Sequence, residues 1–211
     1  MRITVFGANE DIGKHLVNKA LSKGFYVKAY VRDPAKIQIS NSNLEIIKGE
    51  LNDFQKIKKA ITDSNAVIST LGPPLKYKYK GHPILDGHLN IIHAMIELNI
   101  SRFITLATPS IRYSKDEASI ATKLPGIIAR IIYPSPYKEI IQIGKVVQES
   151  DLDWTIVRII APNNKPETQN IKVSFGDKKI KFDIPREDIA NFMLNQVIDK
   201  TYIQSMPIIG S

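Results

Sequence analysis

The stretch Arg2-Ile-Thr-Val-Phe-Gly-Ala-Asn-Glu-Asp-Ile-Gly13 decides the fold. Its first five residues are rich in β-branched and aromatic side chains, which predicts a buried strand. A turn bounded by Gly7 and Gly13 follows at once, and apolar residues then recur at helical spacing as far as Leu21. Residues 25–31 form a second strand-like run. A strand, a glycine turn, a helix and a parallel strand make the first half of a mononucleotide-binding unit.

The glycine turn predicts an anion-binding site at the start of the helix. Gly7 permits a sharp turn out of the strand, and Gly13 lets the helix pack close to the sheet. The free backbone N–H groups of the first helical turn, with the positive end of the helix dipole, suit a pyrophosphate. Glu10 stands where the spacing Gly-x-x-Gly-x-x-Gly has its second glycine, which normally lets the backbone approach a phosphate. We expect Glu10 to weaken dinucleotide binding; the alternative is an exposed side chain that is simply tolerated.

The rest of the chain continues the alternation of strands and helices. The pattern predicts strands at 44–48, 65–70, 102–107, 153–160 and 202–209, and helices at 54–61, 84–98, 136–150 and 186–200. Such alternation implies a parallel sheet with both faces covered, so we predict an α/β fold of the Rossmann type. Residues 1–211 are expected to form one domain, with a small lobe built mainly from about residue 160 to 211. Residues 173–182 are typical of a β-hairpin with Gly176-Asp177 at its turn.

Composition is that of a globular protein. The 211 residues are 43% hydrophobic and 24% charged, an ordinary balance for one domain with a sizeable core. No apolar run reaches the ~18–20 residues that span a bilayer, and the chain begins with a core strand. We therefore expect no membrane partner, no signal peptide and a cytoplasmic location. The absence of cysteine excludes disulfides and thiolate catalysis.

The net charge of +8 can indicate a nucleic acid or another anion as partner. The lysines are scattered, without a block of five or six like charges, so we favour a generally basic surface. One segment, Lys76-Tyr-Lys-Tyr-Lys80, alternates cations with aromatic rings that could stack on nucleic acid or cover a cofactor. Because five residues are a small footprint, we expect an ordinary surface loop there. The four histidines show no metal-ligand spacing, and we assign no metal site.

Seven segments together resemble the atypical short-chain dehydrogenase/reductases, specifically the NmrA-like NAD(P)-binding group that includes the biliverdin-reductase-B and flavin-reductase type. The segments are VFGAN at 5–9 with Ile12-Gly13, YVRDP at 30–34, KGELND at 48–53, AVISTLG at 66–72, RFITLAT at 102–108, DLDWTIVR at 151–158 and IPREDIA at 184–190. They follow the family order and span essentially the whole chain. The resemblance implies a Rossmann fold and NAD(P)-dependent redox chemistry.

The resemblance also implies a cofactor site along the carboxyl ends of the strands. Its candidate residues are Gly7, Asn9, Glu10, Asp11, Ile12, Gly13, Arg32, Lys36, Glu50, Leu51, Thr70, Leu71, Gly72, Ala107 and Thr108. Arg32 follows the second strand, where an arginine suits the 2′-phosphate of NADP, with Lys36 as a helper. Asp33 could instead meet an NAD ribose, but Asp33-Pro34 also fits an N-cap followed by a first-turn proline. We therefore expect NADP rather than NAD.

Glu50 and Thr108 each have two competing explanations. Glu50 stands where relatives often carry an aspartate beside the adenine, and a helix-start carboxylate explains it equally well. Thr108 aligns with a serine of the reductase-type relatives and could orient a substrate carbonyl or the nicotinamide, or only bond local backbone. Tyr133 and Tyr137 are second candidates for catalysis from the region that should border the pocket.

Proton delivery is not assigned by these motifs. The Tyr-x-x-x-Lys pair of the broader dehydrogenase superfamily is missing from the sequence, as it often is in the NmrA-like group. The leading expectation is an NADP-dependent oxidoreductase that transfers hydride to a small, aromatic or conjugated acceptor. The alternative is a non-catalytic dinucleotide-binding redox sensor that acts through a protein partner.

Overall fold

A computed structural model describes the backbone of residues 1–211 and every side chain except that of residue 121. The strands are β1 (Arg2–Phe6), β2 (Tyr26–Val31), β3 (Leu44–Lys48), β4 (Ala66–Ser69), β5 (Arg102–Ala107), β6 (Asp153–Arg158), β7 (Ala161–Asn163), β8 (Lys172–Ser174), β9 (Asp183–Pro185) and β10 (Ile208–Gly210). The helices are α1 (Asp11–Ser22), the short 3-10 helix η1 (Pro34–Lys36), α2 (Phe54–Ile61), α3 (Pro83–Glu97), α4 (Ile120–Ile132), α5 (Pro134–Gln148) and α6 (Arg186–Asn195). Over the described residues, none of these helices combines the length and apolarity that crossing a membrane requires.

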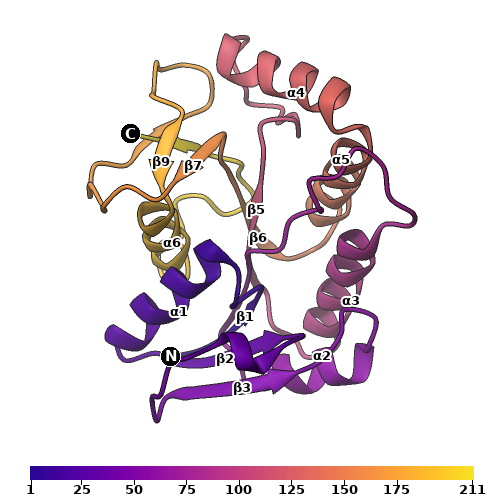
Figure 1. Cartoon of the computed structure of the whole chain (residues 1–211), viewed down its shortest axis with the longest axis vertical. Helices are drawn as coiled ribbons and strands as arrows, with labels where there is room; N and C mark the ends of the chain where they lie inside the picture. Colours follow the sequence, from indigo (N-terminus) through magenta and orange to yellow (C-terminus); the bar gives the residue numbers. More distant parts are fainter.

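One sheet runs through the molecule in the strand order β3-β2-β1-β4-β5-β6-β10-β8 (Figure 1). Its neighbouring strands pair in parallel, except that β8 runs antiparallel to β10. A separate pair, β7 and β9, is also parallel. The strand order reverses direction between β1 and β4, and sheets of this kind bind ligands outside the carboxyl ends of the strands at that point. The predicted Rossmann-type α/β fold is confirmed.

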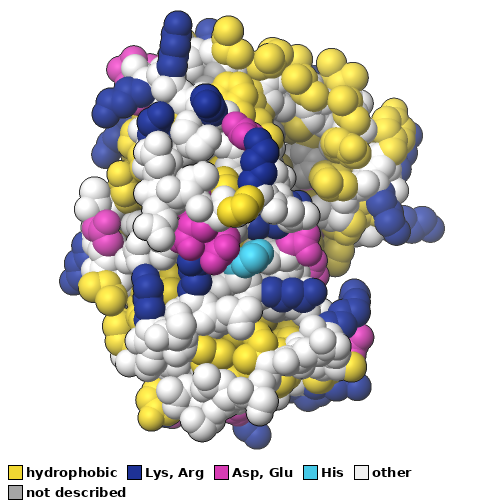
Figure 2. All heavy atoms as spheres, turned by 60° about the vertical axis from the view of Figure 1, so that its left-hand side comes forward, with side chains coloured by type: hydrophobic (Ala, Val, Ile, Leu, Met, Phe, Trp, Pro, Cys, Tyr) yellow, Lys and Arg dark blue, Asp and Glu magenta, His cyan; other side chains and the backbone are white. Residues whose placement is uncertain are grey.

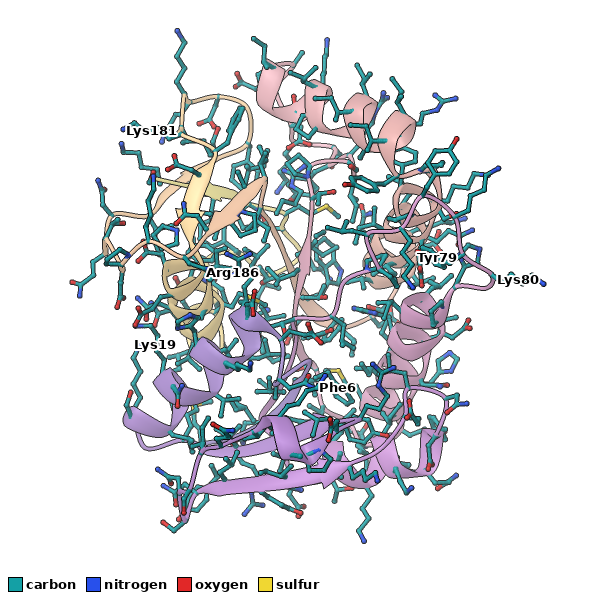
Figure 3. The ribbon with its side chains drawn as sticks, viewed as in Figure 1. Phe6, Lys19, Tyr79, Lys80, Lys181 and Arg186 are labelled. Atoms are coloured by element: carbon teal, nitrogen blue, oxygen red, sulfur yellow. The ribbon has the colours of Figure 1, made fainter. Side chains whose placement is uncertain are left out.

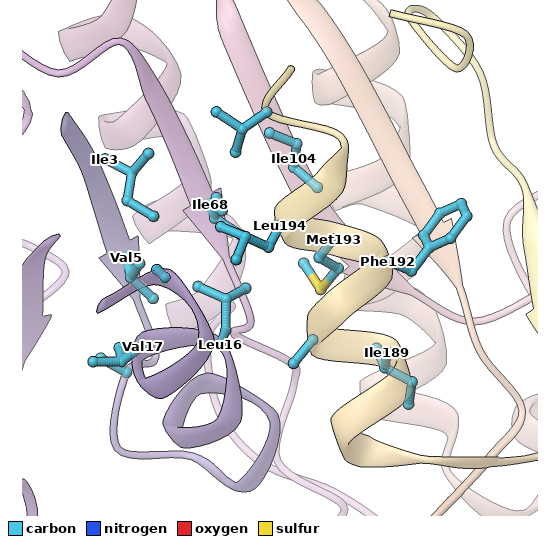
Figure 4. Packing of buried hydrophobic residues seen from close by; sticks show 14 of the residues in the cluster. Ile3, Val5, Leu16, Val17, Ile68, Ile104, Ile189, Phe192, Met193 and Leu194 are labelled. Atoms are coloured by element: carbon cyan, nitrogen blue, oxygen red, sulfur yellow. The ribbon is translucent and has the colours of Figure 1, made fainter. Parts of the chain in front are cut away.

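Helices cover both faces of the sheet, as the uninterrupted apolar strands require. On one face, Ile3 and Val5 of β1 pack with Leu16 of α1 and Met193 of α6 (Figure 4). On the other face, Phe6 joins the side chains of α2, α3 and α5. Side chains alternate across β1, so one short strand anchors both layers. Each fully buried aliphatic side chain contributes roughly 1.5–3 kcal/mol to stability.

The C-terminal third differs from the sequence-based expectation. Residues 173–182 do not form a hairpin, because β8 pairs with β10 in the register Val173 to Ile209. Lys181 instead exchanges backbone hydrogen bonds with Ser211 (3.1 and 3.3 Å). The hairpin prediction is wrong because the end of the chain, distant in sequence, supplies the partner for both segments.

Candidate functional site

The glycine turn is held by close backbone packing. Gly7 adopts φ +78°, the left-handed region that favours glycine. A Cβ on Gly13 would lie 2.1 Å from the Gly7 carbonyl oxygen, so only glycine allows α1 to approach the turn this closely. The Thr70 hydroxyl donates to the carbonyl oxygens of Gly7 (3.0 Å) and Phe6 (3.2 Å). The end of β4 therefore holds the turn that follows β1.

The first turn of α1 presents its backbone amides to one side of this turn. Glu10 is the N-cap residue, and its exposed carboxylate accepts no capping hydrogen bond. Asp11 lies 3.3 Å from Arg186 Nε, which comes from the start of α6. Arg186 also donates to Asn164 Oδ1 at 2.8 Å, and Figure 3 shows it beside α1. The uncapped amides and the nearby guanidinium suit an anion, while Glu10 opposes one.

Sequence reasoning missed Arg186. The residue lies in one of the family-like segments, but nothing local to it indicates a position beside the glycine turn. Only the packing of α6 against α1 brings it there, 175 positions after Asp11.

Arg32 and Asp33 both follow β2, but their surroundings differ. Asp33 caps η1 by accepting a hydrogen bond from the Ala35 amide at 3.2 Å, so its interpretation as an N-cap is confirmed. Arg32 and Lys36 are both exposed, and neither forms an ion pair with a described side chain. The two cations are therefore free to meet a ligand that follows this edge of the sheet.

Glu50 and Leu51 follow β3 and have different environments. Glu50 is exposed, and its carbonyl oxygen accepts from the Tyr30 hydroxyl at 2.8 Å. Leu51 packs against α3, where a Cβ on Gly87 would lie 2.9 Å from its Cδ1. Asp53 is the residue that caps α2, through a first-turn amide at 3.1 Å. The helix-start explanation therefore belongs to Asp53, and the Glu50 carboxylate has no such role.

A cavity of about 610 Å³ opens beside the glycine turn, at the carboxyl ends of β4 and β5. Of the residues predicted from the sequence, it brings together Ile12, Thr70, Leu71, Gly72, Ala107, Thr108, Tyr133 and Tyr137. Side chains from α4 and α5 complete a largely apolar wall. Asn9, Arg32, Lys36 and Glu50 lie outside this lining. The cavity thus meets the glycine turn at Ile12. The residues that follow β2 and β3 lie further along the row of carboxyl strand ends.

Few polar groups face this cavity. The Thr108 hydroxyl is exposed and lies 3.4 Å from the Ser110 amide, which donates to it. Ser110 also lines the cavity; its Oγ is buried and has no hydrogen-bond partner among the described residues. Sequence reasoning missed Ser110, although the rule that selected Thr108, namely polar residues just after a strand, would have reached it two positions later. An unpartnered buried hydroxyl requires an explanation, and a ligand that reaches it from the cavity would supply the missing partner.

A buried ion pair fixes the segment that carries Ser110. The Arg158 guanidinium is fully buried and donates to both oxygens of Asp116, at 2.6 and 2.7 Å. It also donates to the carbonyl oxygen of Ile111 at 3.1 Å. Arg158 ends β6, so this fork attaches residues 110–116 to the central sheet.

The loop at residues 76–80 is anchored at one point. The Tyr79 hydroxyl donates to the buried carboxylate of Glu139 on α5. That carboxylate also accepts from the amides of Ile84 (2.7 Å) and Leu85 (2.9 Å) in the first turn of α3. Burial raises the pKa of Tyr79, and the Glu139 carboxylate raises it further. Figure 3 shows Tyr79 directed inward and Lys80 outward, so the loop is tied down beside the cavity.

His88 is a structural residue beneath the site. It is fully buried; its Nδ1 donates to the Ile84 carbonyl oxygen at 2.8 Å, and its Nε2 accepts from the Thr105 hydroxyl at 3.1 Å. Burial lowers the pKa of His88, so the imidazole is neutral in the folded protein. No three His, Asp or Glu side chains among those described converge as a metal site.

A family model described as NAD(P)H-binding matches residues 7–200, nearly the whole chain. The chain belongs to this NAD(P)H-binding family. The Rossmann fold and the NAD(P)-binding character that the seven motifs predict are confirmed.

Three similar proteins illustrate the range of the family. An uncharacterized chloroplastic protein of Arabidopsis thaliana is 25% identical over 207 residues, which is 94% of this chain and 72% of the relative. A short-chain dehydrogenase/reductase from Veillonella parvula, solved in complex with NADP, superimposes with a TM-score of 0.76 at 21% identity, covering 100% of this chain and 94% of that one. ChuY, an anaerobilin reductase from Escherichia coli O157:H7, has a TM-score of 0.80 at 17% identity, with 100% and 97% covered. At these identities the two structures share the fold with this chain.

Proposed function

We propose that this NAD(P)H-binding protein is an NADP-dependent reductase that transfers hydride to a small, aromatic or conjugated acceptor. The observation that carries the proposal is the apolar cavity of about 610 Å³ that opens directly beside the glycine turn. A dinucleotide with its pyrophosphate at the turn would reach this cavity with its other end. Two of the similar proteins, ChuY and a cinnamoyl-CoA reductase of Petunia hybrida, are reductases by name, which supports the proposed class of reaction.

The residues present fit a dinucleotide at three points. The close approach of Gly13 to the Gly7 carbonyl oxygen holds the amino terminus of α1 against the turn, where its amides suit a pyrophosphate. Arg32 and Lys36, exposed and unpaired among the described side chains, would take the 2′-phosphate. The residues that would border the nicotinamide, which supplies the hydride, are Thr70, Leu71 and Gly72 after β4 and Ala107 at the end of β5.

The acceptor would lie between the strand ends and α4. Thr108 and Ser110 offer hydroxyls that can orient a carbonyl or ring nitrogen, and Tyr133 and Tyr137 form the facing wall. A hydroxyl is a weak acid, so these groups would orient the acceptor while water or the acceptor supplies the proton. The cytoplasmic location expected from the sequence stays a prediction.

Cofactor choice tests the proposal directly. If Arg32 meets the 2′-phosphate, NADPH binds about tenfold to a hundredfold more tightly than NADH, the range expected for one charge-assisted hydrogen bond. Arg32→Ala removes most of this preference. Arg2→Ala is the matched control, because Arg2 lies at the amino end of β1, away from the carboxyl ends of the strands, and its guanidinium meets, among the described side chains, only Asp63, at 3.8 Å, and the Tyr26 ring. Equal affinity of the wild-type protein for both cofactors, measured by calorimetry, would refute the assignment of Arg32.

A non-catalytic redox sensor is the second candidate, and one observation favours it. The described residues that line the cavity include no lysine, histidine or carboxylate that could serve as a general acid. A sensor binds NADPH, and thus resists thermal unfolding, but does not oxidise it. A panel of flavins, quinones, aldehydes and linear tetrapyrroles, monitored by NADPH absorbance, separates the two. Turnover of any acceptor above the rate without protein supports the reductase, whereas cofactor binding without turnover supports the sensor.

A further inference from the structure

Helix α4 exposes the apolar face that a surface helix ordinarily buries. Ile120, Ile127 and Ile131 are 70%, 57% and 70% exposed, on the face directed away from the protein. The opposite face carries the small residues Gly126 and Ala129, which are partly buried. A surface helix normally buries its apolar stripe against the core, so this one lacks a partner for its largest side chains within the described chain.

The loop that follows β4 extends the same apolar surface. Leu75 and Tyr77 are 76% and 62% exposed. Leu75 also lines the mouth of the cavity together with Leu124 and Ile128 of α4, so the loop and the helix adjoin there. We call this combination the α4 surface: Leu75, Tyr77, Ile120, Leu124, Ile127, Ile128, Ile131 and Ile132. Contiguous exposed apolar patches of this kind mark interaction sites.

The positive charge of the protein is concentrated around the α4 surface. Residues 73–82, 108–138 and 174–183 contain eleven lysines and arginines but only four aspartates and glutamates, a formal charge of +7 out of +8 for the whole chain. Lys76 and Lys78 alternate with the exposed Leu75 and Tyr77 in the loop. Figure 2 shows hydrophobic side chains gathered at the end of the molecule where Figure 1 places α4, with Lys and Arg side chains around them.

Three occupants can be compared by their charge and polarity. A second copy of the chain, docked through the same surface, would bring two clusters of positive charge together. A nucleic acid would neutralise the lysines but leave the isoleucines in water. An anionic bilayer satisfies both features, because apolar side chains enter the boundary of the acyl chains while lysines and arginines meet the phosphates.

We propose that the α4 surface docks onto the headgroup region of an anionic lipid bilayer. Helix α4 would lie in the interface, since its 13 residues are too few to span the hydrocarbon core. Because Leu124 and Ile128 belong both to this surface and to the cavity wall, the cavity mouth faces the lipid. The proposal goes beyond the reductase function and does not depend on it. It differs from the expectation, drawn from the sequence, that a membrane is not a partner.

Sedimentation with lipid vesicles tests the proposal on the full chain. The probes are vesicles of phosphatidylcholine alone and of phosphatidylcholine mixed with phosphatidylglycerol. We expect the protein to sediment with the mixed vesicles, about tenfold or more tightly than with the neutral ones, and to be released in part by salt. A protein that stays in the supernatant with anionic vesicles at low salt, while its circular dichroism shows it folded, would overturn the proposal.

Two variants separate insertion from simple charge attraction. Ile127→Ser combined with Ile131→Ser removes outward-facing side chains that do not line the cavity, and should weaken vesicle binding about tenfold or more. Ile198→Ser is the matched control, since Ile198 is 66% exposed and follows α6, and it should bind vesicles like wild type. If the double variant binds anionic vesicles as tightly as wild type, the isoleucines of α4 do not enter the bilayer and the proposal is wrong. A wild-type dimer in analytical ultracentrifugation that the double variant dissociates, without vesicle binding, would assign the surface to a second copy instead.

Discussion

Asp11 in the first turn of α1 and Arg186 in the first turn of α6 form an ion pair, with 3.3 Å between Asp11 Oδ2 and Arg186 Nε. The pair joins the amino termini of two helices beside the glycine turn. It places a guanidinium where the sequence supplies two carboxylates, Glu10 and Asp11, next to the proposed pyrophosphate position. Arg186 therefore offsets part of the negative charge that the Glu10 and Asp11 carboxylates bring to this position.

The first prediction concerns this guanidinium. Arg186→Ala should raise the dissociation constant for NADPH about fivefold to tenfold, because one charge-assisted contact near a solvent-exposed phosphate contributes on the order of 1 kcal/mol. Arg186→Lys should recover part of the affinity, since it restores the charge without the fork. Calorimetric titration measures both. If Arg186→Ala lowers the melting temperature but leaves NADPH affinity unchanged, Arg186 only holds α6 against α1.

The second prediction concerns Glu10. Its carboxylate is exposed, so screening by water reduces a repulsion that would otherwise cost roughly 3 kcal/mol for unit charges about 6 Å apart. Glu10→Gly should therefore tighten NADPH binding only about threefold to tenfold, and more at low salt than at moderate salt. The same change should lower the stability of the cofactor-free protein by less than about 1 kcal/mol, because the N-cap residue Glu10 contributes only its charge at the positive end of the helix dipole. Identical affinities of mutant and wild type at both salt concentrations would show that Glu10 is merely tolerated.

The third prediction compares the hydroxyls in the cavity. Ser110→Ala should lower turnover more than Thr108→Val, because Ser110 Oγ is unpartnered among the described residues whereas the Thr108 hydroxyl already accepts from a backbone amide. Both effects should stay below the ~10²–10⁴-fold loss that follows removal of a general acid. Tyr133→Phe and Tyr137→Phe should each change turnover little. A loss of that larger size in either tyrosine variant would identify the tyrosine as the proton donor.

The fourth prediction concerns the ion pair below Ser110. Asp116→Ala leaves the fully buried Arg158 guanidinium without its carboxylate and should lower the free energy of unfolding by about 3–5 kcal/mol. Glu149→Ala breaks the exposed pair with Lys145, which spans 3.8 Å, and should cost about 0–1 kcal/mol, which makes it the matched control. Urea denaturation measures both values. A loss below about 1 kcal/mol for Asp116→Ala would mean that the segment after β5 is held by other contacts.

The fifth prediction concerns pH. Burial lowers the pKa of His88 from its ordinary value of 6.5, so the unfolded chain takes up a proton below pH 6.5 that the folded protein resists. This contribution to stability is complete above pH 6.5 and is lost as the pH falls below it. Unfolding free energies measured from about pH 7.5 to about pH 5 should decline less steeply in His88→Gln than in wild type. His93→Gln, which changes an exposed histidine on the same helix, should keep the wild-type slope.

Local signals were sufficient for the first half of the fold. The strand before Gly7, the helix after it and the return strand were predicted within a residue or two, because side-chain periodicity and glycine positions determine each element without reference to the rest of the chain. The cap role of Asp33 was also readable, since its partner lies only two residues away. The family motifs worked for the same reason, as each is a short run of adjacent residues.

Residues that meet across long sequence separations escaped prediction. Residues 173–182 have the composition of a hairpin, but β8 pairs with β10 because the sheet offers it a partner from the chain end. The contact of Tyr79 with Glu139, and the position of Arg186 beside Asp11, likewise join segments that are distant in the sequence. No local pattern encodes these partners.

By itself, the sequence determined the order of strands and helices as far as β5, the glycine turn and the class of cofactor, because these depend on periodicity and on short motifs. The tertiary structure alone decided which of these residues share a cavity, that Ser110 lines it, and that Arg186 lies beside Asp11 at the glycine turn. It also decided which face of α4 is exposed. A surface helix normally buries its apolar stripe, but the stripe of α4 points to solvent because the small face of α4 lies against the rest of the protein.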